Sequence, residues 1–166
     1  APVADIDQRY AKCGEDLINI ARKISDHFMP KTKSYYDLWV DDEKVVVRED
    51  GTYEIGRLSP DVEDPIYGKT YLPRKFKIGL AADFDNSVDV YTQDIGIIAV
   101  TENGSILGYE VLAGGGLGYT HRKPDTYARA ATHLTFVTED ELMPILETIV
   151  KVQRDHGGRA NRRYAR

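Results

Sequence analysis

The chain has 166 residues, of which 42% are hydrophobic and 30% charged, a composition typical of one soluble globular domain. The net charge of −5 argues against a nucleic-acid-binding protein, and from these residues we expect neither a secretory leader nor a membrane-spanning segment. The one cysteine, Cys13, cannot form an internal disulfide, a four-cysteine zinc site or an iron–sulfur cluster, and it indicates a reducing, cytoplasmic compartment.

The N-terminal part of the chain is predicted to form a helix followed by short strands. Apolar residues at three- and four-residue steps predict a helix over 5–27 that ends before Pro30. Its apolar face comprises Tyr10, Cys13, Leu17, Ile20, Ala21 and Ile24. The aromatic and β-branched run over 35–40 predicts a strand, and 45–47 predicts a shorter one within a stretch rich in charge, Gly and Pro.

The rest of the chain is predicted to alternate strands, loops and a final helix. A strand is expected over 74–81, and strands over 95–101 and 105–112 are joined by an Asn-Gly turn, a strong hairpin signal. A glycine loop over 114–118 and a short helix over 126–132 follow. Thr138 and Glu141 form a capping box that opens the last helix, and Gly157 ends it. Its apolar stripe comprises Leu142, Ile145, Leu146, Ile149, Val150 and Val152.

This order of elements predicts an α+β fold with a mixed sheet flanked by helices. We expect a single domain over 1–166, with a leading helix in 1–30 and the sheet, glycine loop and C-terminal helix in 31–166.

Arg74-Lys75-Phe76-Lys77 is the first candidate site. Alternation along a strand places Lys75 and Lys77 on one face and Arg74 and Phe76 on the other. Two neighbouring ammonium groups repel each other unless solvent or an anion lies between them. A Lys-x-Lys pair is usually part of a solvated face, but in a pocket it would suit proton delivery to a bound anion.

The glycine loop and the basic residues after it are further candidates. Three consecutive glycines, Gly114, Gly115 and Gly116, allow a ligand to approach bare backbone amides, although most such loops are tight connections. The loop matches neither a Walker nor a dinucleotide-binding pattern. Lys123 and Arg129 would suit carboxylate or phosphate groups, or else belong to a solvated loop. The four histidines show no metal-ligand spacing, and Cys13 is expected to be buried and inert.

Several strings in this chain resemble the sulfite/nitrite reductase hemoprotein family. Residues 71–77 (Tyr-Leu-Pro-Arg-Lys-Phe-Lys) are similar to the lysine-bearing strand of that family. The strings Glu102-Asn103-Gly104, Leu107-Gly108-Tyr109 and Gly114-Gly115-Gly116-Leu117 are similar to its hairpin and glycine loop. The strings over 28–30, 36–41, 126–129 and 153–157 match in the same order, so the resemblance extends from about 18 to 163.

The resemblance implies a domain like the nitrite/sulfite reductase 4Fe–4S domain. Proteins of the family reduce sulfite to sulfide, or nitrite to ammonia, by six electrons, at siroheme linked through a cysteine to a [4Fe–4S] cluster. Lys75 and Lys77 carry over as catalytic residues that hold the oxyanion and help deliver protons. Backbone at Gly114, Gly115, Gly116 and Leu117 would approach the macrocycle, and Arg74, Lys123 and Arg129 would meet its carboxylates.

The chain departs from the family pattern in what it lacks. The four cluster cysteines and the other substrate-binding arginines are absent, so we expect part of a larger reductase that is inactive alone. Its partners would be sulfite or nitrite, the remaining domains, and an electron-donating flavoprotein or ferredoxin. The alternatives are a nitrite reductase fragment, a stand-alone module that binds a tetrapyrrole or another anion without catalysis, and a structural half of a pseudo-symmetric protein.

Overall fold

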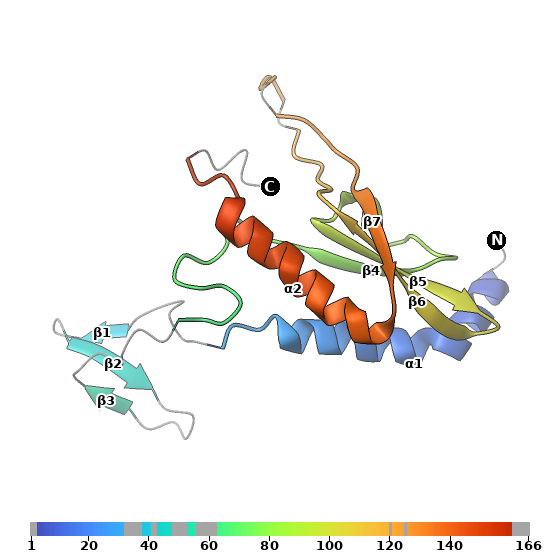
Figure 1. Cartoon of the computed structure of the whole chain (residues 1–166), viewed down its shortest axis with the longest axis horizontal. Coiled ribbons are helices and arrows are strands. Elements are labelled where there is room, and N and C mark those ends of the chain that lie inside the picture. The colour runs from blue at the N-terminus through green and yellow to red at the C-terminus, as the bar shows by residue number, and fades with distance from the viewer. Residues whose placement is uncertain are drawn as a thin grey trace.

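The computed structural model describes residues 3–31, 38–40, 43–47, 53–55, 63–119, 121–124 and 126–160, with side chains for those within 11–31 and 63–160. Two helices, α1 (Val3–His27) and α2 (Glu139–His156), lie against a four-stranded sheet (Figure 1). The strands stand side by side in the order β4 (Ile78–Ala82), β5 (Ile95–Glu102), β6 (Ser105–Ala113) and β7 (Thr132–Val137). No helix in these ranges combines the length and hydropathy needed to cross a membrane.

The sheet is mixed, as the sequence predicts. β4 pairs with β5 in parallel, whereas β5–β6 and β6–β7 are antiparallel. The connection between the parallel strands contains a short 3-10 helix, η1 (Val90–Thr92). This α+β arrangement of a mixed sheet and two helices confirms the predicted fold class.

A second, antiparallel sheet contains β1 (Leu38–Val40), β2 (Glu43–Val47) and β3 (Tyr53–Ile55). It lies beyond the C-terminal end of α1, away from the four-stranded sheet (Figure 1). β2 confirms the strand predicted over 45–47. Of the strand predicted over 35–40, residues 38–40 form β1, and residues 35–37 lie outside the described ranges.

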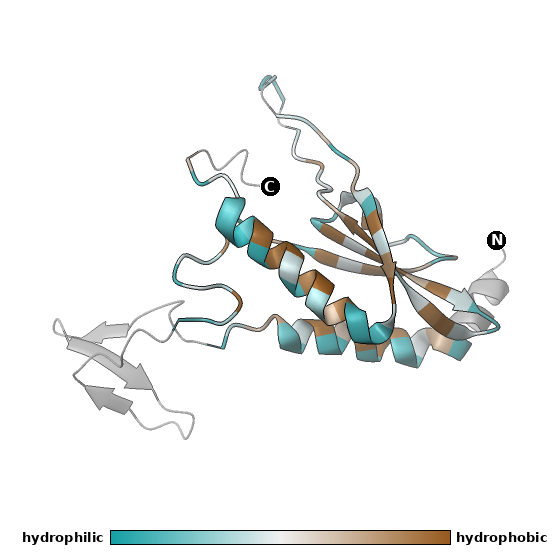
Figure 2. Cartoon of the chain, viewed as in Figure 1, coloured by the Kyte–Doolittle hydropathy of each residue, from teal (hydrophilic) through white to brown (hydrophobic). Residues whose placement is uncertain are grey.

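Each helix buries one stripe of apolar side chains, and Figure 2 shows such residues recurring along both helices. The buried residues of α1 are Cys13, Leu17, Ile20 and Ile24, and those of α2 are Leu142, Leu146 and Val150. Two residues predicted for these stripes, Ala21 and Val152, are exposed, Val152 by 53%, because they lie on the outer sides of their helices. The side chain of Tyr10 lies outside the described set.

The core lies between the helices and one face of the sheet. Ile95, Ile97 and Ala99 of β5 are fully buried there, together with Val111 of β6. A smaller cluster of Ala81, Val90, Leu112 and Ala131 covers part of the opposite face. Because burying a Val, Leu or Ile side chain stabilises a fold by roughly 1.5–3 kcal/mol, the central strands β5 and β6 are the most firmly held part of the sheet.

The predicted capping box is present at the start of α2. The carboxylate of Glu141 accepts hydrogen bonds from the backbone N–H of Thr138, at 3.0 Å, and from its hydroxyl, at 2.9 Å. These two bonds, the backbone one first, lower the pKa of Glu141.

The predicted hairpin is also confirmed. Asn103 and Gly104 both have positive φ values, 54° and 85°, as a two-residue turn of type I′ requires.

Two predicted elements differ from the structure. The strand expected over 74–81 begins only at Ile78, because the N–H of Lys77 donates to a side chain instead of joining the sheet's ladder. The helix expected over 126–132 does not form. Arg129 and Gly116 exchange backbone hydrogen bonds of 2.8 Å, and the alternating residues from Thr132 onward pair with β6 as β7. Pairing along the edge of an existing sheet overrides the weak helical preference of this segment.

Candidate functional site

Lys75 and Lys77 lie in an irregular segment directly before β4. We call residues 74–77 the lysine segment. Both are exposed, whereas Phe76 between them is half-buried and packs against the core. The expected alternation of exposure is therefore present although the sheet ladder has not begun. Within the described ranges, neither ammonium group has a hydrogen-bond or ion-pair partner, and both are free to meet a ligand.

The backbone of Lys77 is held by the residues that lead into β5. Its N–H donates to Oδ2 of Asp94 at 2.8 Å, and its carbonyl accepts the N–H of Ile95 at 3.0 Å. Lys77 is thus fixed on both sides of its α-carbon just before the first paired residues of the two strands, Ile78 and Ile95.

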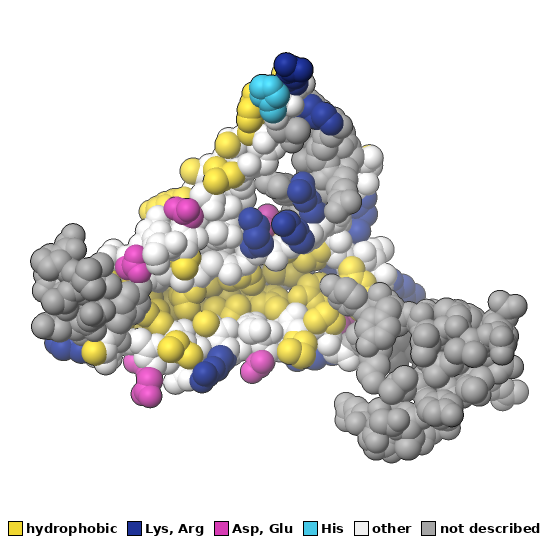
Figure 3. Space-filling view, turned by 180° about the vertical axis from the view of Figure 1, so that it is seen from behind, with side chains coloured by type: hydrophobic (Ala, Val, Ile, Leu, Met, Phe, Trp, Pro, Cys, Tyr) yellow, Lys and Arg dark blue, Asp and Glu magenta, His cyan; other side chains and the backbone are white. Residues whose placement is uncertain are grey.

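A cavity of about 710 Å³ opens beside Arg74 and Lys75, the first two residues of the lysine segment. Arg74 and Lys75 are its cationic lining residues. The remaining lining is apolar or aromatic and comprises Phe28, Pro30, Tyr67, Tyr71, Leu72, Phe76, Ile78 and Val150. On the face opposite to the view of Figure 1, Lys and Arg side chains gather beside a continuous apolar strip (Figure 3). This surface is suited to a ligand that is partly apolar and partly anionic.

The loop that leads to the lysines is fastened to the end of α1. Asp64, which is 2% exposed, accepts the N–H groups of Ile66 and Tyr67 at 2.9 Å and that of Lys31 at 2.8 Å. The hydroxyl of Tyr67 donates to the carbonyl of Phe28 at 2.6 Å. The chain just before the cavity is therefore locked to the C-terminal end of α1.

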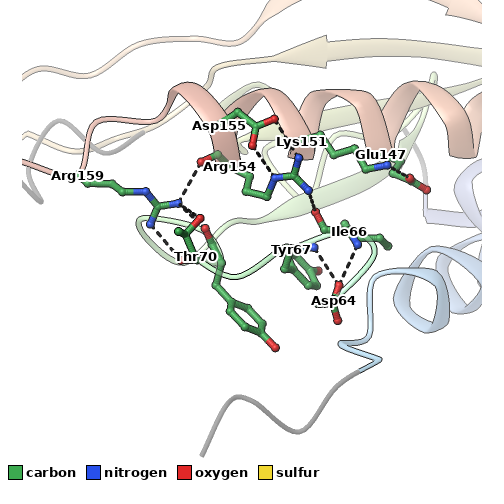
Figure 4. A network of polar contacts seen from close by, with 10 residues as sticks. Asp64, Ile66, Tyr67, Thr70, Glu147, Lys151, Arg154, Asp155 and Arg159 are labelled. Atoms are coloured by element: carbon green, nitrogen blue, oxygen red, sulfur yellow. Dashed lines mark hydrogen bonds and ion pairs between the residues drawn. The ribbon is translucent and has the colours of Figure 1, made fainter. Parts of the chain in front are cut away.

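The same loop is fastened to the end of α2 by two arginines (Figure 4). Arg154 donates to the carbonyl of Ile66 at 2.7 Å, and Arg159 donates to that of Thr70 at 3.1 Å. Arg154 also forms a two-point contact with Asp155 at 2.7 and 2.9 Å, and this guanidinium lowers the pKa of Asp155. Because these contacts hold the end of the loop, they fix the position at which Pro73 and the lysine segment begin.

The glycine loop forms a tight backbone packing. The N–H groups of Gly114, Gly115 and Gly116 donate to the carbonyls of Asp94, Gln93 and Arg129 at 2.9, 3.1 and 2.8 Å. A Cβ on Gly115 would lie 2.4 Å from the carbonyl oxygen of Tyr91 and 2.5 Å from that of Gln93. At these three positions the loop is therefore the tight connection that most such loops form, and its N–H groups already donate to backbone carbonyls. Gly115 is needed so that the η1 segment can lie against the loop. Leu117, the next site residue, is 66% exposed.

The two basic residues predicted beyond the loop are placed differently. Arg129 folds back onto the loop, donating to the carbonyl of Gly114 at 2.6 Å and to the hydroxyl of Thr132 at 2.7 Å. Lys123 lies in the connection between β6 and β7, where its carbonyl accepts the N–H and the hydroxyl of Thr126. Among the described contacts, no hydrogen bond joins Lys123 to the loop or to the lysine segment.

Comparison of the sequence with known proteins identifies the family of this chain. Residues 20–166 match the nitrite and sulphite reductase 4Fe–4S domain. The chain belongs to this family. The sulfite reductase [NADPH] hemoprotein beta-components of Shewanella putrefaciens and Shewanella oneidensis are 44% and 46% identical to it over 156 residues. These alignments cover 94% of this chain and 26% of each relative, so the chain spans about a quarter of their length.

The nitrite and sulphite reductase match confirms the resemblance inferred from the strings over 71–77 and 102–117. The residues present do not fit a [4Fe–4S] cluster, because Cys13 is the one thiol and is 1% exposed. Burial, and then Asp16 and Asp83, raise the pKa of this thiol, which opposes the thiolate form that binds iron. No group of three or more His, Cys, Asp or Glu in the described part of the chain could hold a metal ion.

The residues that join the parts of the site were not predicted. Asp94 contacts both the lysine segment and the glycine loop, and Gln93 and Tyr91 supply carbonyls to the chain around them. Asp64, Arg154 and Arg159 act from outside the site. The sequence signal for Asp94 is its position: a short acidic residue directly before an apolar strand can accept the N–H of a neighbouring strand that has not yet entered the ladder.

Proposed function

We propose that this chain is part of a siroheme-dependent sulfite reductase that catalyses the six-electron reduction of sulfite to sulfide. In this proposal Lys75 and Lys77 hold the anion, and the cavity beside Arg74 and Lys75 forms part of the siroheme pocket. The observation that carries it is a pair of exposed ammonium groups that have no partner among the described residues and lie on a firmly anchored segment, in a chain 44–46% identical to sulfite reductase hemoprotein components.

The chemistry follows from the two lysines. An oxyanion between their ammonium groups would relieve their mutual repulsion and accept hydrogen bonds from both. Each ammonium can give a proton to an oxygen that leaves as water, and solvent can restore that proton because both side chains are exposed. Phe76, between the two lysines, packs against the core. This packing keeps both ammonium groups on the exposed side of the segment, where they can meet a ligand.

The residues present fit a tetrapyrrole better than they fit a cluster. Arg74, which lines the aromatic cavity, and the exposed Lys123 could pair with its carboxylates, which leaves Lys75 and Lys77 for the anion. Arg129 is already bound to the glycine loop, so its role would be to hold that loop in place. When bound, siroheme would supply the iron that takes up the anion and passes electrons to it.

The proposal is tested by replacing both lysines with alanine in the full-length reductase. We expect kcat/KM for sulfite to fall by at least about a hundredfold, because two charge-assisted contacts to the reacting anion are lost. Lys69→Ala is the matched control, since Lys69 is an exposed lysine on the loop just before the cavity. Turnover that is equal in the double variant and the control would refute the proposal.

We also propose that the 166-residue chain does not reduce sulfite alone, because a single thiol cannot relay electrons through a cluster. By analogy with the NADPH-linked relatives, the electron donor would be a separate flavoprotein component. Sulfide release by the isolated chain with a chemical reductant would contradict the first statement. Equal turnover with reduced ferredoxin as the donor would contradict the second.

A further inference from the structure

Asp94 occupies the junction between η1 and β5 and is half-buried. Its side chain and its main chain each contact a different part of the site. Carboxylate oxygen Oδ2 accepts the N–H of Lys77 at 2.8 Å, and the backbone carbonyl accepts the N–H of Gly114 at 2.9 Å. One residue therefore joins the lysine segment to the glycine loop.

The neighbours of Asp94 complete the connection. Ile95 donates its N–H to the carbonyl of Lys77, and Gln93 accepts the N–H of Gly115. On the far side, Arg129 donates to the carbonyl of Gly114, which closes the loop against the edge of β7. The Asp94 carboxylate and the Arg129 guanidinium are the side chains in these contacts, and the other contacts are between backbone groups. Loss of the Asp94 side chain would therefore free the N–H of Lys77 while its carbonyl stays bonded to Ile95.

The choice of aspartate at this junction has an electrostatic cost. A carboxylate that lies beside an anion-binding lysine repels the anion, and a neutral acceptor would serve binding better. The geometry of Lys77 explains the acceptor: its N–H precedes the first ladder pair and therefore has no carbonyl opposite to it. A short side chain with an oxygen at this distance supplies the missing partner.

We propose that Asp94 is a positioning residue for sulfite reduction, which holds the backbone of Lys77 so that its ammonium group stays aimed at the anion and in register with the glycine loop. This inference rests on the proposed function of Lys75 and Lys77. It predicts that anion binding requires the hydrogen-bond acceptor and does not require its negative charge, so asparagine should replace Asp94 without loss of binding.

The contact itself is tested by amide hydrogen exchange of the ¹⁵N-labelled 166-residue chain. In Asp94→Ala, the N–H of Lys77 should exchange at least about tenfold faster, while amides within β5, such as that of Ile97, keep their protection. Asp94→Asn should leave the exchange of Lys77 unchanged. Exchange at Lys77 that is the same in Asp94→Ala and in the unmodified chain would overturn the inference.

The functional consequence is tested in the full-length reductase with a matched control at the other end of the same strand pair. Asp83 accepts the N–H and the hydroxyl of Thr101 at 2.9 Å, so Asp83→Ala removes comparable bonds far from the lysines. Asp94→Ala should raise KM for sulfite about tenfold, whereas Asp94→Asn and Asp83→Ala should stay within about twofold of the unmodified enzyme.

Equal KM values in Asp94→Ala and Asp83→Ala would overturn the positioning role, even if Lys77 exchanges faster. A failure of the proposed function is recognised separately. In that case the double lysine variant retains turnover, while the exchange measurement still reports whether Asp94 holds Lys77.

Discussion

Removal of the Asp64 side chain should destabilise the fold more than any surface substitution. Asp64→Ala leaves three N–H groups without their acceptor: those of Ile66 and Tyr67, which share one carboxylate oxygen, and that of Lys31, which uses the other. A hydrogen bond to a charged group contributes about 1.5–3 kcal/mol, and an unsatisfied buried donor adds a desolvation penalty. The bond from the N–H of Ile66 is buried and the other two are partly buried, so the lower end of about 1.5 kcal/mol applies to each of the three bonds, and the expected loss is about 4.5 kcal/mol.

Asp64→Asn separates the two oxygens of the carboxylate. Its remaining oxygen can keep the bonds to Ile66 and Tyr67, whereas its NH₂ group would face the N–H of Lys31, so the expected loss is about 1–2 kcal/mol. Asp140→Ala is the control. It removes an exposed acidic residue from the first turn of α2 and should cost less than about 1 kcal/mol.

Urea denaturation followed by circular dichroism measures these losses. With an m-value of about 2 kcal/mol per M for a domain of this size, Asp64→Ala should lower the midpoint by about 2 M and Asp64→Asn by less than about 1 M. The order alanine, asparagine, control is the essential result. A midpoint for Asp64→Ala equal to that of Asp140→Ala would show that the Asp64 contacts do not hold the loop.

Two further predictions concern acid stability and the glycine loop. The pKa of Glu147 lies below its ordinary value of 4.5 because of hydrogen bonds from Lys151 and then His27. The stability that Glu147 contributes is present above its unfolded-state pKa and is lost as the pH falls through its folded-state pKa. Glu147→Gln should therefore lessen the fall in the free energy of unfolding, measured in urea, between about pH 6 and about pH 3. An unaltered pH dependence would refute this. Gly115→Ala places a Cβ against two backbone carbonyls and should cost about 2–3 kcal/mol in thermal unfolding, and an unchanged midpoint would contradict the packing.

The sequence predicts the elements whose signals are local. The apolar spacing of the two helices, the Asn103-Gly104 turn and the Thr138 capping box each depend on residues a few positions apart, and all are found as expected. The start of β4 and the whole of β7 depend on partners distant in the sequence. Lys77 donates to a carboxylate of a later segment, and Thr132–Val137 becomes a strand because β6 offers it an edge.

The candidate site shows the same division. The basic residues of the site can be read from the sequence because their chemistry is carried by their own side chains, and Lys75 and Lys77 remain predictions that turnover must test. The sequence leaves both a ligand contact and a tight connection open for the three glycines, because a glycine run does not reveal whether its amides meet a ligand or another segment of backbone. In the structure their N–H groups donate to backbone carbonyls. Asp94 was not predicted, because its importance arises from its carboxylate contacting the lysine segment while its carbonyl contacts the glycine loop.

The arginines at the end of α2 have a consequence for synthesis on the ribosome. Arg154 and Arg159 hold the carbonyls of Ile66 and Thr70, which are translated long before them. A nascent chain that ends before Arg154 can already pair β4 through β7, yet the loop that leads to the lysines lacks its two arginine contacts to the end of α2. The loop before the lysines therefore acquires its contacts to α2 only after that helix has been translated, and a chain that stops before Arg154 would hold this loop through α1 alone.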